Sequence, residues 1–197
     1  MNSELLRIIG IPQNHWNARL QCIPDVCSHK ETLTTYCENI ISNVQSGQGL
    51  YIWGDYSMGK SAAASICLKA AARSRIFGRW VRAKELPGIQ IENHLMPESG
   101  ELMFEDLRNT SLLVIDEFQI RKEVKYTESL VEDVVRYRID RQLPTIITSN
   151  VVLNDLKLRY PAMYAVLQES LYPVRFQGHD FRKSFGGKVS GLDTRNE

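Results

Sequence analysis

The segment that most constrains the fold of this chain is a glycine-containing loop between an apolar run and an alanine-rich run. The loop matches the pattern G-x-x-x-x-G-K-S and consists of Gly54, Asp55, Tyr56, Ser57, Met58, Gly59, Lys60 and Ser61. Residues 50–53 before it predict a short buried strand, and residues 61–72 after it are rich in good helix formers. Glycines let several backbone N–H groups converge on one anion, and a helix start adds unpaired donors. Strand, loop and helix together predict a phosphate cradle.

Two residues of this loop carry the chemistry of nucleotide binding. In this pattern we expect Lys60 to reach the β- and γ-phosphates and the Ser61 hydroxyl to ligate Mg²⁺. The alternative, a chance glycine turn, is disfavoured because a strand precedes the loop and a helix follows it. We therefore expect the chain to bind a nucleoside triphosphate.

The composition is that of an ordinary globular protein. The 197 residues are 43% hydrophobic and 24% charged, with a net charge of +1, so a nucleic-acid partner must meet a local basic patch. No apolar stretch reaches the ~18 residues of a membrane span, and the N-terminus lacks a signal-peptide core. We therefore expect a cytoplasmic protein with no membrane partner.

The cysteines, with His29 among them, raise the alternative of a zinc site. Their spacing lacks the paired C-x-x-C pattern that such sites usually show. We therefore expect free thiols at Cys22, Cys27, Cys37 and Cys67.

Apolar runs alternate with segments of helical periodicity, which predicts an α/β fold with a parallel sheet covered by helices on both faces. The predicted strands are 50–53, 77–81, 111–115, 144–148 and 173–177. The predicted helices are 30–46, 60–75, 102–107, 127–140, 153–159 and 161–170, with a loop over 86–100. We expect one domain, with an N-terminal segment 1–48, a core 49–185 and a flexible tail 186–197.

Polar residues follow two of these strands. Asp116 and Glu117 come directly after 111–115, at the sheet edge where ligands of open α/β sheets bind. We expect Asp116 to hold Mg²⁺, directly or through water, and Glu117 to polarise the attacking water. Asn150 follows the strand at 144–148, and we expect it to orient that water or touch the γ-phosphate. The alternatives are a solvated acidic turn and an ordinary turn asparagine.

Four segments resemble one family, the AAA+ ATPases of the DnaC helicase-loader and IstB transposition-helper group. They are 54–61, 112–118, 136–150, which ends in LPTIITSN, and 174–182. The segment Gly10-Ile11-Pro12 is also similar to the family's segment just upstream of the nucleotide.

This resemblance implies a P-loop NTPase of the AAA+ type, with strand order 5-1-4-3-2 and with ATP and Mg²⁺ as ligands. It also implies that Ile11 and Pro12 lie near the base. Arg182 is a candidate sensor of the nucleotide in cis, and the alternative is a surface residue at the end of a strand. The family further implies a site completed by a neighbouring subunit, in a self-associated or hetero-oligomeric assembly. The partners implied are a hexameric replicative helicase and single-stranded DNA.

Two features depart from the family pattern. Only about ten residues precede Ile11, so we expect the family's N-terminal helicase-binding region to be missing or rebuilt. Relatives place an arginine that acts on a neighbour's γ-phosphate shortly before the last strand, whereas residues 162–169 contain none. Such an arginine is worth on the order of 10³–10⁵ in rate, so we expect slow hydrolysis unless Arg159 or a partner substitutes for it.

A basic stripe follows the first core helix and includes Arg73, Arg75, Arg79, Trp80, Arg82 and Lys84. This stripe suits contact with single-stranded DNA, or it is a solvated edge blunted by charge. A second basic group, Arg136, Arg138 and Arg141, is a candidate for a subunit interface. The leading hypothesis is an ATP-dependent helicase loader or replication accessory ATPase. The alternatives are a transposition helper that organises duplex DNA and a nucleotide-gated adaptor with little hydrolysis.

Overall fold

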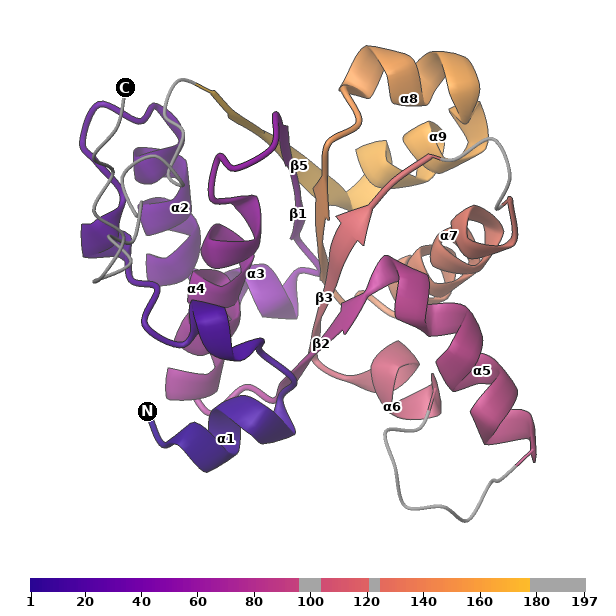
Figure 1. Ribbon diagram of the computed structural model, residues 1–197, viewed down its shortest axis with the longest axis horizontal. Helices are drawn as coiled ribbons and strands as arrows, with labels where there is room; N and C mark the ends of the chain where they lie inside the picture. The colour runs from indigo at the N-terminus through magenta and orange to yellow at the C-terminus, as the bar shows by residue number, and fades with distance from the viewer. Residues whose placement is uncertain (96–103, 121–124, 178–197) are drawn as a thin grey trace, which may run out of the picture.

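The computed structural model describes residues 1–95, 104–120 and 125–177. Its centre is a five-stranded parallel sheet in the order β2-β3-β4-β1-β5 (Figure 1). The strands are β1 (Gly49–Gly54), β2 (Gly78–Arg82), β3 (Leu112–Phe118), β4 (Thr145–Ser149) and β5 (Leu171–Phe176). Read from the other edge, the order is 5-1-4-3-2, so the predicted α/β sheet and its strand order are confirmed.

Helices cover both faces of this sheet, as Figure 1 shows. On one face lie α1 (Ser3–Ile8), α2 (His29–Glu38), α3 (Ile40–Gln45) and α4 (Lys60–Arg73). On the other lie α5 (Leu86–Leu95), α6 (Phe104–Asn109), α7 (Lys125–Ile139), α8 (Leu153–Arg159) and α9 (Pro161–Ser170). Alternate strand residues enter the two apolar clusters: Leu50 and Ile52 of β1 belong to the α4 side, and Tyr51 to the α7 side.

Two predicted elements are corrected by the structure. The helix expected over 30–46 is two helices, because Asn39 leaves helical geometry (φ −98°, ψ 22°) and its side-chain amide donates to the Thr35 carbonyl. The loop expected over 86–100 begins with helix α5, since Pro87 lies in the first turn, where a missing N–H costs nothing. The rest of that loop lies outside the described residues, as does the tail at 186–197.

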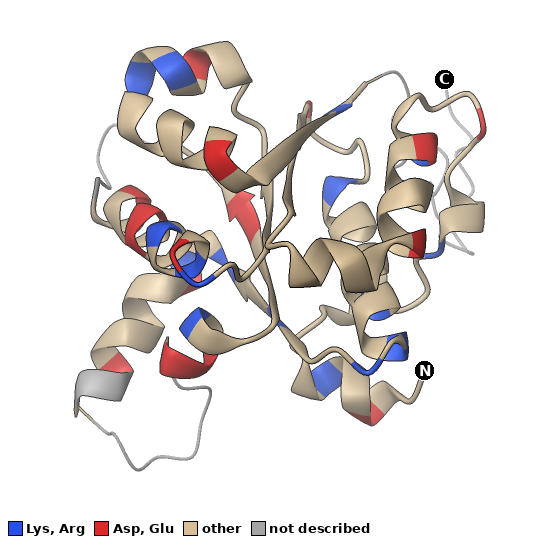
Figure 2. Ribbon diagram, turned by 180° about the vertical axis from the view of Figure 1, so that it is seen from behind, with Lys and Arg blue, Asp and Glu red and all other residues tan. Residues whose placement is uncertain are grey.

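Charged residues of both signs are spread over the helices on both faces of the sheet (Figure 2). Arg79 and Trp80 of the predicted basic stripe make internal contacts. Arg79 donates to the Ile8 carbonyl, and Trp80 is 4% exposed. Stacking of Trp80 on DNA bases is therefore excluded in this conformation, and that part of the stripe prediction is wrong.

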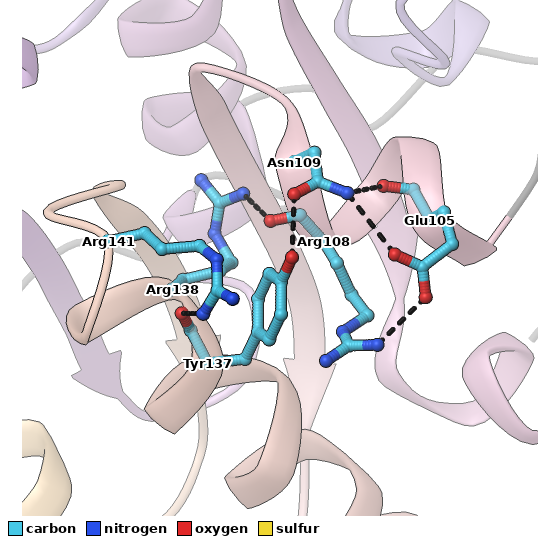
Figure 3. A network of polar contacts seen from close by, with 6 residues as sticks. All are labelled: Glu105, Arg108, Asn109, Tyr137, Arg138 and Arg141. Carbon is cyan, nitrogen blue, oxygen red and sulfur yellow. Dashed lines mark hydrogen bonds and ion pairs between the residues drawn. The ribbon is translucent and has the colours of Figure 1, made fainter.

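Arg138, which the sequence placed with two other arginines at a subunit interface, is fully buried instead. Its guanidinium donates to Thr145 Oγ1 and to the carbonyl oxygens of Leu107, Arg108, Thr110 and Pro144. Figure 3 shows this side chain beside Tyr137, whose ring packs between the guanidinium groups of Arg108 and Arg141, each 3.6 Å from the ring centroid. Arg138 therefore ties α6 and α7 to the starts of β3 and β4.

No helix in the described part of the chain is long and apolar enough to cross a membrane.

Candidate nucleotide-binding site

The glycine loop connects the end of β1 to the start of α4, as predicted from the sequence. Gly59 has a left-handed backbone conformation (φ 83°, ψ 16°), which a glycine adopts without strain. A Cβ at Gly54 would come 2.1 Å from the Phe176 carbonyl oxygen, so the close approach of β1 to β5 requires glycine there. The two glycines therefore fix the loop's shape at its two ends.

Lys60 lies inside this loop and is only 8% exposed. Its Nζ donates to the carbonyl oxygens of Gly54, at 2.8 Å, and of Asp55. Burial lowers the pKa of Lys60 to about 8, against the opposing effects of the Asp55 and Asp116 carboxylates. A desolvated ammonium with only carbonyl partners gains strongly from a nearby anion, which suits a phosphate-binding role.

Asp116 and Ser61 meet at the carboxyl edge of β3. Asp116 is 3% exposed, and its Oδ1 accepts a 2.6 Å hydrogen bond from Thr148 Oγ1 on β4. Burial raises the pKa of the Asp116 carboxyl, whereas hydrogen bonds from Thr148 and Ser61 lower it. The buried carboxylate of Asp116 and the hydroxyl of Ser61 are together suitable oxygen ligands for Mg²⁺.

Glu117 occupies a different environment from its neighbour. Its side chain is exposed and its backbone φ is 59°, an uncommon value outside glycine. Its N–H donates to Thr148 Oγ1 at 3.0 Å, so one threonine fixes both acidic residues. The positive φ coincides with a register shift between β3 and β4 after Ile115.

The end of β4 is tied to β3 by a second hydroxyl. Ser149 Oγ donates to the Phe118 carbonyl at 2.8 Å and accepts from the Val151 N–H. Half-buried Asn150 follows this anchored residue and lines the same cavity as Glu117. Glu117 and Asn150 therefore lie around one space, whereas Asp116 is not among the residues that line it.

That space is a cavity of about 740 Å³, a size that accommodates a nucleotide. Its lining from the predicted site comprises Tyr56, Ser57, Met58, Gly59, Lys60, Ser61, Glu117 and Asn150. Ile11, expected near the base, is instead buried in the apolar core, and neither Ile11 nor Pro12 is among the lining residues. Arg182 lies outside the described residues.

The sequence did not indicate the other part of the lining. It comprises Asn14, His15, Asn17, Ala18, Arg19, Cys22, Ile23, His29, Ala62, Ala63, Ile66, Gln119, Thr148, Ser149 and Phe176. Ala62, Ala63, Thr148 and Ser149 adjoin the predicted motifs, whereas most of the others come from segments far from them in the chain, so local patterns could not assign those to a site. All four cysteines are unpaired thiols, and Cys37 Sγ lies 3.8 Å from Cys67 Sγ.

Lys69 is a further residue whose role the sequence did not indicate. It lies on α4, is 4% exposed, and its Nζ donates to the carbonyl oxygens of His15, Trp16 and Ala18. Burial lowers the pKa of Lys69 to about 8. A lysine within a helix is normally solvated, so its spacing carried no signal. Lys69 fixes the segment that forms one wall of the cavity.

Solved structures resemble this arrangement. The DnaC helicase loader superposes with a TM-score of 0.69 at 23% identity, covering 84% of this chain and 100% of that one. DnaI gives a TM-score of 0.67 at 17% identity, covering 87% and 94%. The chain has the AAA+ fold. The replication initiator DnaA bound to AMPPCP and single-stranded DNA gives 0.65 at 12% identity, covering 92% of this chain and 58% of that one.

Comparison of the sequence itself gives no match to a family model or to a curated protein. At these low identities the structural likeness establishes the fold, and the function rests on the site.

Proposed function

We propose that this protein binds and hydrolyses ATP and acts as a helicase loader or accessory ATPase in DNA replication, on single-stranded DNA. The observation that carries the proposal is that three predicted site residues line one cavity of nucleotide size: Lys60 at the start of α4, Glu117 near the end of β3 and Asn150 directly after β4. Ligands of open α/β sheets bind at this edge.

The residues present fit a Mg²⁺–nucleotide complex. Ser61 and Asp116 would hold the metal, which supplies charge neutralisation for the phosphates when it is bound. Lys60 would bind the terminal phosphates, and the exposed Glu117 carboxylate would accept a proton from the attacking water. Asn150 would orient that water. This set supplies positioning and charge stabilisation, on which phosphoryl transfer depends.

The replication role is supported by the solved structures of similar fold, which include a helicase loader and a DnaA bound to AMPPCP and single-stranded DNA. The second candidate is a nucleotide-gated adaptor with little turnover. It is favoured by α9, whose sequence carries no arginine to act on a neighbour's nucleotide. Arg159, exposed at the end of α8, is the candidate substitute.

Substitution of Lys60 tests nucleotide binding. Lys60→Ala removes the buried ammonium from the loop, and we expect ATP affinity to fall at least about 100-fold, as for loss of a charged contact to phosphate. Isothermal titration with Mg²⁺–ATP measures the change. Lys84→Ala, at an exposed position, is the matched control. Equal ATP affinity in parent and Lys60→Ala would remove the proposed site.

Substitution of Glu117 tests hydrolysis. Glu117→Gln keeps the shape and the backbone geometry but removes the base, so we expect turnover to fall about 10²–10⁴-fold with ATP binding retained. Phosphate release is measured for the protein alone, with single-stranded DNA and with duplex DNA. The mass of the protein assembly is determined in parallel. Stimulation by single strands supports the loader, and stimulation by duplex supports a transposition helper. Tight ATP binding without turnover under any condition supports the adaptor.

A further inference from the structure

His29, the first residue of α2, is buried but leaves its polar atoms unused. The side chain is 3% exposed, and its ring stacks on Phe176 with centroids 3.7 Å apart and an interplanar angle of 16°. Neither Nδ1 nor Nε2 has a hydrogen-bond partner within the part of the chain that the structure describes. Buried polar atoms are nearly always satisfied in folded proteins, so unpaired nitrogens point to a missing partner.

The position of this ring indicates what that partner is. His29 and Phe176 line the same cavity as the phosphate loop, together with Ile23 and Ile66. The side chains of Phe176, Ile23 and Ile66 belong to the apolar cluster on the α4 side of the sheet. A nucleotide whose phosphates occupy the Lys60 loop must place its remaining, less polar part elsewhere in this cavity. The apolar lining around His29 is suited to a planar base.

The chemistry of the ring fits the edge of a base. Burial lowers the pKa of His29, with no charged group contributing to the shift, so the imidazole is neutral at pH 7. A neutral imidazole offers one donor and one acceptor. Nucleobase edges carry matching donors and acceptors. Phe176 contacts the imidazole by stacking alone, which leaves both ring nitrogens available to such an edge.

We propose that His29 recognises the nucleobase: a ring nitrogen hydrogen-bonds the base edge, while Phe176 keeps the imidazole in place. The inference rests on the proposed function, because it assumes that the phosphates lie at Lys60. It makes His29 a binding residue for nucleosides and not for polyphosphate. A base-free triphosphate has no group that reaches this ring, so it gains nothing from His29.

The test replaces His29 by phenylalanine, which keeps a planar ring for stacking and removes both nitrogens. Isothermal titration at pH 7.5 compares Mg²⁺–ATP with Mg²⁺–tripolyphosphate for the parent and for His29→Phe. We expect ATP affinity to fall about tenfold, the effect of one lost buried hydrogen bond, and tripolyphosphate affinity to stay unchanged. The control is Lys30→Ala. Lys30 follows His29 in the chain, pairs with Asp25 and is not among the residues that line the cavity, so this variant should bind both ligands as the parent does.

Three outcomes would overturn the proposal. Parent-like ATP affinity in His29→Phe would mean that the nitrogens face water or nothing, and equal loss of both ligands would mean that the residue is only structural. A melting temperature well below that of the parent would also mean a structural role, because removing unpaired nitrogens should leave the ligand-free protein at least as stable. Tripolyphosphate that binds equally to the parent and to Lys60→Ala would instead overturn the proposed phosphate site.

Discussion

At the scale of single residues, the two neighbouring carboxylates of β3 show how one strand end creates two environments. Asp116 is buried and hydrogen-bonded to Thr148, whereas Glu117 turns outward through a positive φ and lines the cavity. A buried, fixed carboxylate is suited to holding a metal, and an exposed one to exchanging a proton with water. The division of roles follows from solvation and backbone geometry, since the two side chains have the same chemistry.

The burial of Asp116 has a cost that a substitution should reveal. Because the folded-state pKa of Asp116 is raised, its charged form destabilises the ligand-free protein above that pKa. We expect Asp116→Asn to raise the free energy of unfolding at pH 7 by about 1 kcal/mol and to abolish the effect of Mg²⁺ on ATP affinity. Chemical denaturation and titrations with and without Mg²⁺ measure the two effects. A less stable variant would contradict the argument.

The stability difference should also depend on pH in one direction. As pH falls toward the raised pKa, the parent takes up a proton at Asp116 and loses the cost of the charge. The advantage of Asp116→Asn over the parent should therefore shrink in acid.

At the scale of secondary-structure elements, α4 does more than start at the phosphate loop. Lys60 in its first turn donates to the loop, and Lys69 further along donates to the carbonyl oxygens of His15, Trp16 and Ala18. One helix thus positions both the glycine loop and the N-terminal segment that forms another wall of the cavity. The two lysines are also the two buried cations of this helix.

Removal of the second lysine should affect the wall and leave the loop intact. Lys69→Met keeps the apolar stem but removes the donor of the Trp16 and Ala18 carbonyl oxygens and one of the donors of the His15 carbonyl, so we expect the free energy of unfolding to fall by about 1–3 kcal/mol. ATP affinity should fall while tripolyphosphate affinity changes little, because Lys60 is unaffected. Denaturation and titration of this variant beside Lys84→Met provide the comparison. Equal losses for both ligands would show that α4 acts as a single unit.

The elements that could be predicted are those determined by local pattern. The strand, loop and helix at 50–73 follow from apolar runs and glycines, and Asp116, Glu117 and Asn150 follow from the ends of buried strands. The break at Asn39 could not be predicted, because the apolar spacing continues across it. The helical start of 86–100 was missed because Pro87 and Gly88 are also typical of loops.

The residues that could not be predicted are mostly buried polar ones. Arg138 and Trp80 occur in charged stretches that favour an exposed position, and Lys69 is a charged residue of the alanine-rich helix α4; each is at most 4% exposed. Their burial depends on partners brought together by the fold. For Arg138 these are carbonyl oxygens at the ends of α6 and at the strand starts, which no short-range spacing reveals.

At the scale of the whole molecule, the cavity lies where the sheet's carboxyl edge meets the N-terminal segment. The phosphate part comes from consecutive motif residues, whereas His29 and Phe176 lie far apart in the sequence and meet only in the fold. The sequence therefore predicted the positions of the glycine loop and of the strand ends better than the part of the cavity around His29.

Two histidines of the cavity lining, His15 and His29, should make the ligand-free protein acid-sensitive. Burial lowers the pKa of His29 and of His15 below 6.5, and for His15 Lys69 and Arg82 add to the shift while Glu117 opposes it. Between those folded-state values and 6.5 the unfolded chain binds more protons than the folded one, so stability falls as pH falls. We expect the melting temperature to drop from about pH 7 to about pH 5.5, and to drop less in His29→Phe. Thermal unfolding across this range measures both slopes, and parallel profiles for the two proteins would show that His29 titrates normally.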